Sequence, residues 1–216
     1  MATVWTFGDS LTERYNPIFK WSQAYINWKG YVPKVYGNFV SEMLNYDLQN
    51  LGKAGCDNYT IFESFYKAYP KIKDEDVIII GWTSVGRFRF VNENGEWTTF
   101  NPNFDNYISH LGYISKNTID EIFINRTHSK YIDEVNDWIE FINKLCENIP
   151  IVHWSTIKGE GELNTHHFFE MERIYTETNG IVNDAHFSEE GQKQLSDKIL
   201  NALVRGNKGI KPNKLI

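Results

Sequence analysis

The chain has 216 residues, a formal net charge of −6 and only two cysteines. That length suits one sizeable α/β domain. No basic block occurs before a short lysine-containing tail, which argues against nucleic-acid binding, and two cysteines supply no disulfide framework. No apolar run is long enough to span a bilayer, and strand-like sequence begins by Thr3, so we expect no signal peptide. These features predict a cytoplasmic protein with no nucleic-acid or membrane partner.

Short apolar runs indicate strands at Thr3–Phe7, Asp47–Leu51, Val77–Ile80 and Ile151–Trp154. Continuous apolar strands of this kind are typical of a parallel sheet that is buried on both faces. Apolar residues recur at helical spacing in the segments 36–46, 58–69, 131–149 and 188–203. The alternation predicts a three-layer α/β/α sandwich with a flavodoxin-like parallel sheet in the strand order 2-1-3-4-5.

Residues 1–205 are expected to form a single domain, and residues 206–216 a C-terminal tail. Two stretches interrupt the alternation of strands and helices. The first, at about 15–35, is rich in aromatic residues, and the second, at about 86–129, runs long before the next clear helix. Both follow the C-terminal end of a strand, where α/β proteins carry their functional loops. We interpret them as loop insertions into the domain.

Ser10, which follows Gly8 and Asp9 after the first strand, has two interpretations. Serine is a good helix N-cap. It is also placed to act as a nucleophile, because a helix beginning at Ser10 would direct its N–H groups and its dipole at developing negative charge. In the strand order 2-1-3, the loops after the first three strands are neighbours. Ser10, Gly55 and Thr83 are therefore expected to lie together, and His186 enters on the loop before the last helix.

Four segments resemble, in chain order, the signature blocks of the SGNH/GDSL hydrolase family: GDSL (8–11), NLGKAGCDN (50–58), GWTS (81–84) and VNDAHFSEEGQ (182–192). The resemblance implies the SGNH hydrolase fold and a serine esterase activity that needs neither a metal nor an organic cofactor. It also implies that Ser10 is the nucleophile and His186 the general base. The backbone N–H groups of Ser10 and Gly55 would then form part of the oxyanion hole.

Two blocks depart from the family pattern. The third block usually carries an asparagine that donates to the oxyanion, and Thr83 stands in its place; a hydroxyl donates one hydrogen bond but reaches less far. Either Thr83 or the neighbouring Ser84 substitutes for the asparagine, or the site is weak or inactive. In the last block the acid usually stands three residues before the histidine, where this chain has Asn183. We assign Asp184 as the carboxylate that orients His186, with Asn183 as the alternative.

Three further side chains are assigned to substrate binding. Trp82 and Trp154 offer rings for stacking on a sugar, with packing into an apolar cluster as the alternative. Arg87 would attract an acidic group at the mouth of the site, and a solvated strand face is the alternative there.

These residues predict a serine esterase that removes acyl groups from a carbohydrate or a similar small ester through an acyl-enzyme. Acyl transfer to a sugar alcohol would use the same residues. The alternative from another class is a weak or inactive SGNH-like module that binds a glycan or a protein. The Asn-, Lys-, Ile- and Tyr-rich composition and the GWTS segment also resemble phage-encoded members of the family, for which a virion-associated role would be expected. Oligomeric state is not indicated by the sequence.

Overall fold

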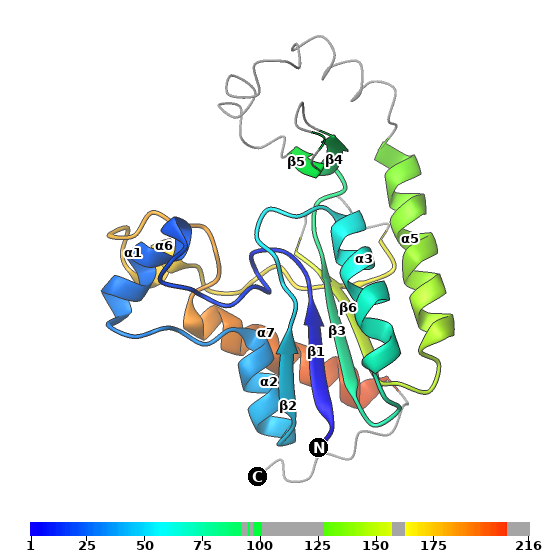
Figure 1. Ribbon diagram of the computed structural model, residues 1–216. Helices are drawn as coiled ribbons and strands as arrows, with labels where there is room; N and C mark the ends of the chain where they lie inside the picture. The colour runs from blue at the N-terminus through cyan, green and yellow to red at the C-terminus, as the bar shows by residue number, and fades with distance from the viewer. Residues whose placement is uncertain (92–94, 96, 101–127, 157–162, 207–216) are drawn as a thin grey trace.

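The computed structural model describes residues 1–91, 95, 97–100, 128–156 and 163–206. Its centre is a five-stranded sheet in the order β2-β1-β3-β6-β7, in which every neighbouring pair is parallel (Figure 1). The strands are β1 (Thr3–Phe7), β2 (Asp47–Asn50), β3 (Val77–Trp82), β6 (Ile151–Ser155) and β7 (His166–His167). The predicted strand order is confirmed. Its fifth strand, β7, has only two residues and was not apparent from the sequence.

Helices cover both faces of this sheet (Figure 1). One face packs against α3 (Asn58–Ala68) and α5 (His128–Leu145), and the other against α2 (Tyr36–Leu44) and α7 (Glu189–Arg205). Side chains alternate across a strand, so Ile78 and Ile80 of β3 face the first pair of helices, whereas Val77 and Ile79 face the second. Because both faces are buried, the predicted three-layer sandwich is confirmed.

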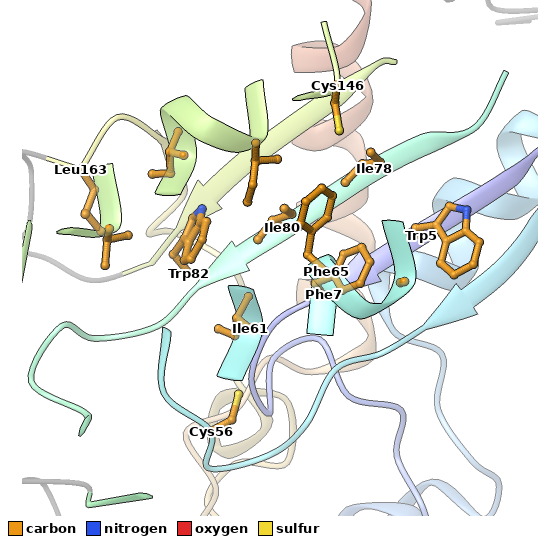
Figure 2. Packing of buried hydrophobic residues seen from close by; sticks show 14 of the residues in the cluster. Trp5, Phe7, Cys56, Ile61, Phe65, Ile78, Ile80, Trp82, Cys146 and Leu163 are labelled. Atoms are coloured by element: carbon orange, nitrogen blue, oxygen red, sulfur yellow. The ribbon is translucent and has the colours of Figure 1, made fainter. Parts of the chain in front are cut away.

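Figure 2 shows the core on the side of α3 and α5. Phe7, the last residue of β1, meets Phe65 of α3 edge to face, with ring centroids 5.7 Å apart and planes at 75°. Both side chains are fully buried, as is Ile80 of β3. Burying an aromatic ring of this size stabilises the fold by about 1.5–3 kcal/mol. This packing fixes the end of β1 immediately before the GDSL segment.

The first predicted insertion, at about 15–35, holds α1 (Lys20–Lys29) and contacts α6 (Ile174–Glu177). The Tyr25 hydroxyl donates to Glu177 at 2.5 Å, and the Lys29 ammonium lies 2.7 Å from the same carboxylate. Because Glu177 joins two side chains of α1, it fixes this insertion against the segment that leads to α7.

The remaining short elements are the 3-10 turn η1 (Tyr69–Lys71) and the antiparallel strands β4 (Phe88–Val91) and β5 (Trp97–Phe100). The two strands lie at the start of the second predicted insertion. Residues 101–127 of that insertion, and residues 207–216 of the predicted tail, lie outside the described residues. Among the helices that the structure describes, none is both long and apolar enough to cross a membrane.

Candidate active site

Ser10 lies in a tight turn directly after β1, and the helix expected to begin there is not present. The Asp9 carbonyl accepts hydrogen bonds from the N–H groups of Thr12 (2.9 Å) and Glu13 (3.0 Å), and the next helix is α1. Gly8 is required before this turn because a Cβ there would lie 2.1 Å from Thr12 Oγ1. A turn therefore presents the serine, and the expectation of a helix dipole behind it was wrong.

Ser10, His186 and Asp184 form a continuous hydrogen-bonded relay. Ser10 Oγ lies 2.8 Å from His186 Nε2, and His186 Nδ1 lies 2.5 Å from Asp184 Oδ1. The same carboxylate oxygen accepts the backbone N–H of His186 at 2.8 Å. With the proton on Nδ1, the ring donates to Asp184 and accepts from the serine hydroxyl at Nε2. This is the arrangement that a general base needs to take the proton of a hydroxyl nucleophile.

The electrostatics of this relay keep Asp184 ionised. Burial acts to raise the pKa of the carboxyl, but the hydrogen bonds from the ring and backbone of His186 and its electrostatic interaction with the ring outweigh burial and lower the pKa below its usual value. Asn183, the alternative orienting residue, lines the cleft and makes no hydrogen bond to the ring within the described residues. The structure therefore brings Asp184 to the histidine despite its shifted position in the sequence.

The loop that carries Asp184 and His186 is held from two directions. The Tyr175 N–H of α6 donates to the Asp184 carbonyl at 3.0 Å. The hydroxyl of Tyr15, a buried residue of the first insertion, donates to the Phe187 carbonyl at 2.6 Å. These bonds fix the loop before a substrate arrives, which is how a catalytic side chain is kept within reach of its partner.

The two backbone N–H groups predicted for the oxyanion hole are those of Ser10 and Gly55. Neither Ser10 N nor Gly55 N donates to an acceptor within the described residues. Gly55 is exposed and has φ of 74°, a backbone region that favours glycine. Its loop is joined to the end of β1, because Lys53 N donates to the Gly8 carbonyl at 2.9 Å. Gly55 is not among the residues that line the cleft, so its role in the oxyanion hole stays a prediction.

The Thr83 hydroxyl is directed at a neighbouring carboxylate. Thr83 is buried, and its Oγ1 donates to Asp9 Oδ2 at 2.8 Å. Its backbone is fixed by Asn58, whose side chain accepts from Thr83 N at 2.8 Å and donates to Thr83 O at 2.9 Å. In this arrangement the one proton of the hydroxyl is already used. The prediction that Thr83 supplies the third oxyanion donor is therefore not supported by its hydrogen bonding.

Arg87 lines the cleft but is paired within the protein. Its Nη1 lies 3.0 Å from Asp9 Oδ2, and the two side chains are 17% and 11% exposed. Asp9 Oδ1 in addition accepts from Leu11 N at 3.0 Å. Asp9 thus joins the turn of the serine to the segment after β3, and it offsets the charge with which Arg87 was expected to attract an acidic substrate.

The two tryptophans line the cleft as buried side chains. Trp82 is 3% exposed and Trp154 2% exposed, so neither presents an open ring face on which a sugar can stack. A Cβ on Gly81 would lie 2.6 Å from the Trp154 ring, which shows how closely that indole packs on β3. Both residues contribute to the wall of the cleft, and their predicted stacking role is not supported by their burial.

His153 of β6 is a buried residue behind the cleft that sequence reasoning missed. Its Nδ1 accepts the Trp82 indole N–H at 3.1 Å, and the two rings stack at 18°. Burial, with a smaller contribution from nearby His166, lowers the pKa of His153 to about 3, so the ring is neutral and keeps its acceptor lone pair. The signal available in the sequence was a histidine inside an apolar strand. Asn58, which fixes the backbone of Thr83, was also missed, although it is the last residue of the second block.

The relay opens into a cleft of about 360 Å³. The predicted site residues that line this cleft are Ser10, Trp82, Thr83, Arg87, Trp154, Asp184 and His186. They come from the ends of β1, β3 and β6 and from the loop before α7, as the strand order predicts. Within the part of the chain that the structure describes, no group of three or more histidine, cysteine or acidic side chains is arranged to hold a metal ion.

The sequence matches no protein-family model, and no curated protein is similar to it. Solved structures do resemble the chain. A carbohydrate esterase whose active site displays divergent catalytic and non-catalytic binding functions is 13% identical, with a TM-score of 0.50, over 94% of this chain and 68% of its own. A GDSL-like lipase from Parabacteroides merdae is 14% identical, also with a TM-score of 0.50, over 94% and 95%. At such low identity the likeness concerns the fold: the chain has the fold of the SGNH hydrolases.

Proposed function

We propose that the protein is a serine esterase that cleaves small acyl esters through an acyl-enzyme. The observation that carries this proposal is the unbroken relay from Ser10 Oγ through His186 to Asp184 Oδ1, with separations of 2.8 and 2.5 Å. A serine hydroxyl is a weak nucleophile until a base accepts its proton, and the base must itself be oriented. Ser10 as the nucleophile, His186 as the base and Asp184 as the group that orients the base all line one cleft.

The reaction follows from this geometry. Ser10 Oγ attacks the ester carbonyl while His186 Nε2 takes the hydroxyl proton, and Asp184 stabilises the imidazolium that forms. The oxyanion of the tetrahedral intermediate is stabilised by the N–H groups of Ser10 and Gly55. When the intermediate collapses, the bond to the alcohol breaks and His186 gives the proton to the leaving oxygen. Water then attacks the acyl-enzyme while His186 takes its proton. The bond between the acyl group and Ser10 Oγ breaks, and His186 returns the proton to the serine.

The substrate that we propose is an acylated carbohydrate with a short acyl group. A cleft of about 360 Å³ lies near the lower end of the range for small-molecule sites, which favours an acetyl group over a long chain. One structural neighbour with a TM-score of 0.50 is a carbohydrate esterase. These two observations support the proposal at the level of substrate class.

A fluorophosphonate probe and p-nitrophenyl acetate test the proposal. The wild type is expected to be labelled and to hydrolyse the ester, whereas Ser10→Ala and His186→Ala lose both properties. Ser64→Ala is the matched control, because Ser64 is a partly exposed serine of α3 that does not line the cleft. Labelling that persists in Ser10→Ala, or a wild type that neither reacts nor hydrolyses, would contradict the proposal.

A second candidate function is glycan binding without efficient catalysis. The observation that favours it is the Thr83 hydroxyl, which donates to Asp9 and leaves the oxyanion with two backbone donors. Loss of one oxyanion donor costs roughly 10²–10³ in kcat in other enzymes. Under this second function, the wild type would bind acetylated sugars as tightly as Ser10→Ala does and would turn over none of them. Equilibrium binding measured beside turnover separates the two functions.

A further inference from the structure

A second pocket, of about 190 Å³, lies next to the catalytic cleft on the other side of Arg87. Arg87 lines both cavities, and Asp9, its ion-pair partner, lines the catalytic cleft. The residues that line the pocket come from the start of α3, from the segment that runs into β4 and from α5. The side chain of Arg87 is therefore the wall that the two cavities share.

Most charged groups that line the pocket already have partners inside the protein. Arg87 is paired with Asp9, Arg89 stacks on Tyr59, and Asp57 accepts the Thr60 N–H at 2.8 Å. The exposed carboxylate of Glu134 is a hydrogen-bond acceptor on the same lining. A neutral ligand with hydroxyl groups can donate to this carboxylate and brings no further charge into the pocket. A sugar offers such hydroxyl groups, whereas a long acyl chain would desolvate the Glu134 carboxylate and give it no partner.

The aromatic side chains of the pocket pack against one another and against Arg89. The Arg89 guanidinium stacks on Tyr59 at 3.4 Å from the ring centroid. Tyr59 meets Trp138 edge to face at 5.8 Å, and Phe62 stacks on Trp138 at 5.3 Å. Tyr59 is nonetheless 38% exposed. Side chains that are fixed in advance lose little conformational entropy on binding, so they form an effective wall for the C–H face of a ring.

We propose that this pocket is a subsite for a neutral sugar ring of the ester substrate, with Tyr59 and Trp138 as its wall and Glu134 as an acceptor for hydroxyl groups. The inference rests on the proposed esterase function, which it extends to the leaving alcohol. A volume of about 190 Å³ is below the range of drug-sized sites, so it suits one ring. Binding energy gained there would hold the scissile ester at Ser10.

Kinetics with two kinds of ester test the subsite. Tyr59→Leu and Glu134→Gln are compared with the wild type on mono-O-acetylated xylose, glucose and galactose and on p-nitrophenyl acetate, which has no sugar. We expect kcat/KM for at least one sugar acetate to fall about tenfold more than kcat/KM for p-nitrophenyl acetate, as expected for loss of one strong contact. Tyr66→Leu is the matched control, because Tyr66 is a 61% exposed tyrosine of α3 outside the pocket.

Equal losses on both kinds of ester, or no losses, would overturn the subsite. So would faster hydrolysis of p-nitrophenyl octanoate by Tyr59→Leu, because the pocket would then take an acyl chain. Binding of the same sugar acetates to Ser10→Ala protein, measured by saturation-transfer NMR, needs no turnover. If the wild type hydrolyses nothing, the esterase proposal fails, and the subsite still stands only if Tyr59→Leu weakens this binding and Tyr66→Leu does not.

Discussion

Replacing Asp184 by asparagine tests whether this carboxylate sets the orientation and the tautomer of His186. In the native protein Asp184 Oδ1 accepts both the ring Nδ1–H and the backbone N–H of His186, at 2.5 and 2.8 Å. An asparagine amide keeps the shape but can donate its own N–H to Nδ1. The ring would then carry its proton on Nε2, where it no longer accepts the proton of Ser10.

The change of tautomer determines how large a loss of kcat we expect. The same substitution in a Ser-His-Asp triad lowers kcat about 10⁴-fold, which corresponds to about 5 kcal/mol of transition-state stabilisation. The pKa of Asp184 is lowered by its contacts with His186, so the native carboxylate is charged near neutral pH and its replacement removes a full charge beside the imidazolium. We expect a loss of kcat close to this magnitude, with a smaller change in KM.

The assay is turnover of p-nitrophenyl acetate at about pH 7, with Ser10→Ala protein as the measure of uncatalysed background. Asn183→Ala is the control, because Asn183 is the adjacent residue that lines the cleft and makes no hydrogen bond to His186 within the described residues. We expect this control to change kcat by less than about tenfold. Similar losses in the two variants, or a larger loss in Asn183→Ala, would refute the assignment of Asp184.

Three further predictions concern residues around the relay. Gly81→Ala puts a methyl group 2.6 Å from the buried Trp154 ring and should lower the free energy of unfolding by about 1–3 kcal/mol in urea denaturation; an unchanged value would mean that the indole moves freely. The pKa of His153 is about 3 in the folded protein and 6.5 in an unperturbed chain, so the unfolded state gains protons first as the pH falls. The free energy of unfolding should therefore fall by up to about 2 kcal/mol more in the wild type than in His153→Gln between about pH 6.5 and 5, and parallel curves would contradict this. Thr83→Val should lower kcat for p-nitrophenyl acetate by less than about tenfold, because the hydroxyl serves Asp9; a loss of 10²–10³ would instead make it an oxyanion donor.

The sheet and its order were predictable because their signal is local. A strand buried on both faces must be apolar along its whole length, and Val77–Ile80 has this property without interruption. Once the strand order was predicted from such runs, the meeting of Ser10, Thr83 and His186 followed from topology. β7 was missed because two residues, His166 and His167, give no periodicity to detect.

The hydrogen bonds of the site were not predictable, because they join residues that are far apart in the chain. Asp9 and Arg87 are separated by 78 positions, and no local pattern pairs them. The turn at Ser10 was mistaken for a helix start because Asp and Ser favour both structures. The choice between Asn183 and Asp184 depended on how the loop before α7 bends, and the hydrogen bonds that Asp184 Oδ1 accepts from His186 show which residue the loop brings to the ring.

The contacts of Asp9 explain how the site differs from the signature blocks that the sequence resembles. Its carboxylate accepts from Thr83 and from Arg87, so the position at which an asparagine would serve the oxyanion instead serves the turn that carries Ser10. The hydrogen bonds from Ser10 to His186 and from His186 to Asp184 are all formed, whereas the predicted oxyanion donors are reduced to the backbone N–H groups of Ser10 and Gly55. A hydroxyl nucleophile needs these hydrogen bonds to react at all and the oxyanion donors to react fast, so we expect a low kcat if the proposed esterase function holds. Fluorophosphonate labelling reports the hydrogen-bonded relay and kcat reports the oxyanion donors, so the two should diverge in this protein: labelling would be efficient and turnover slow.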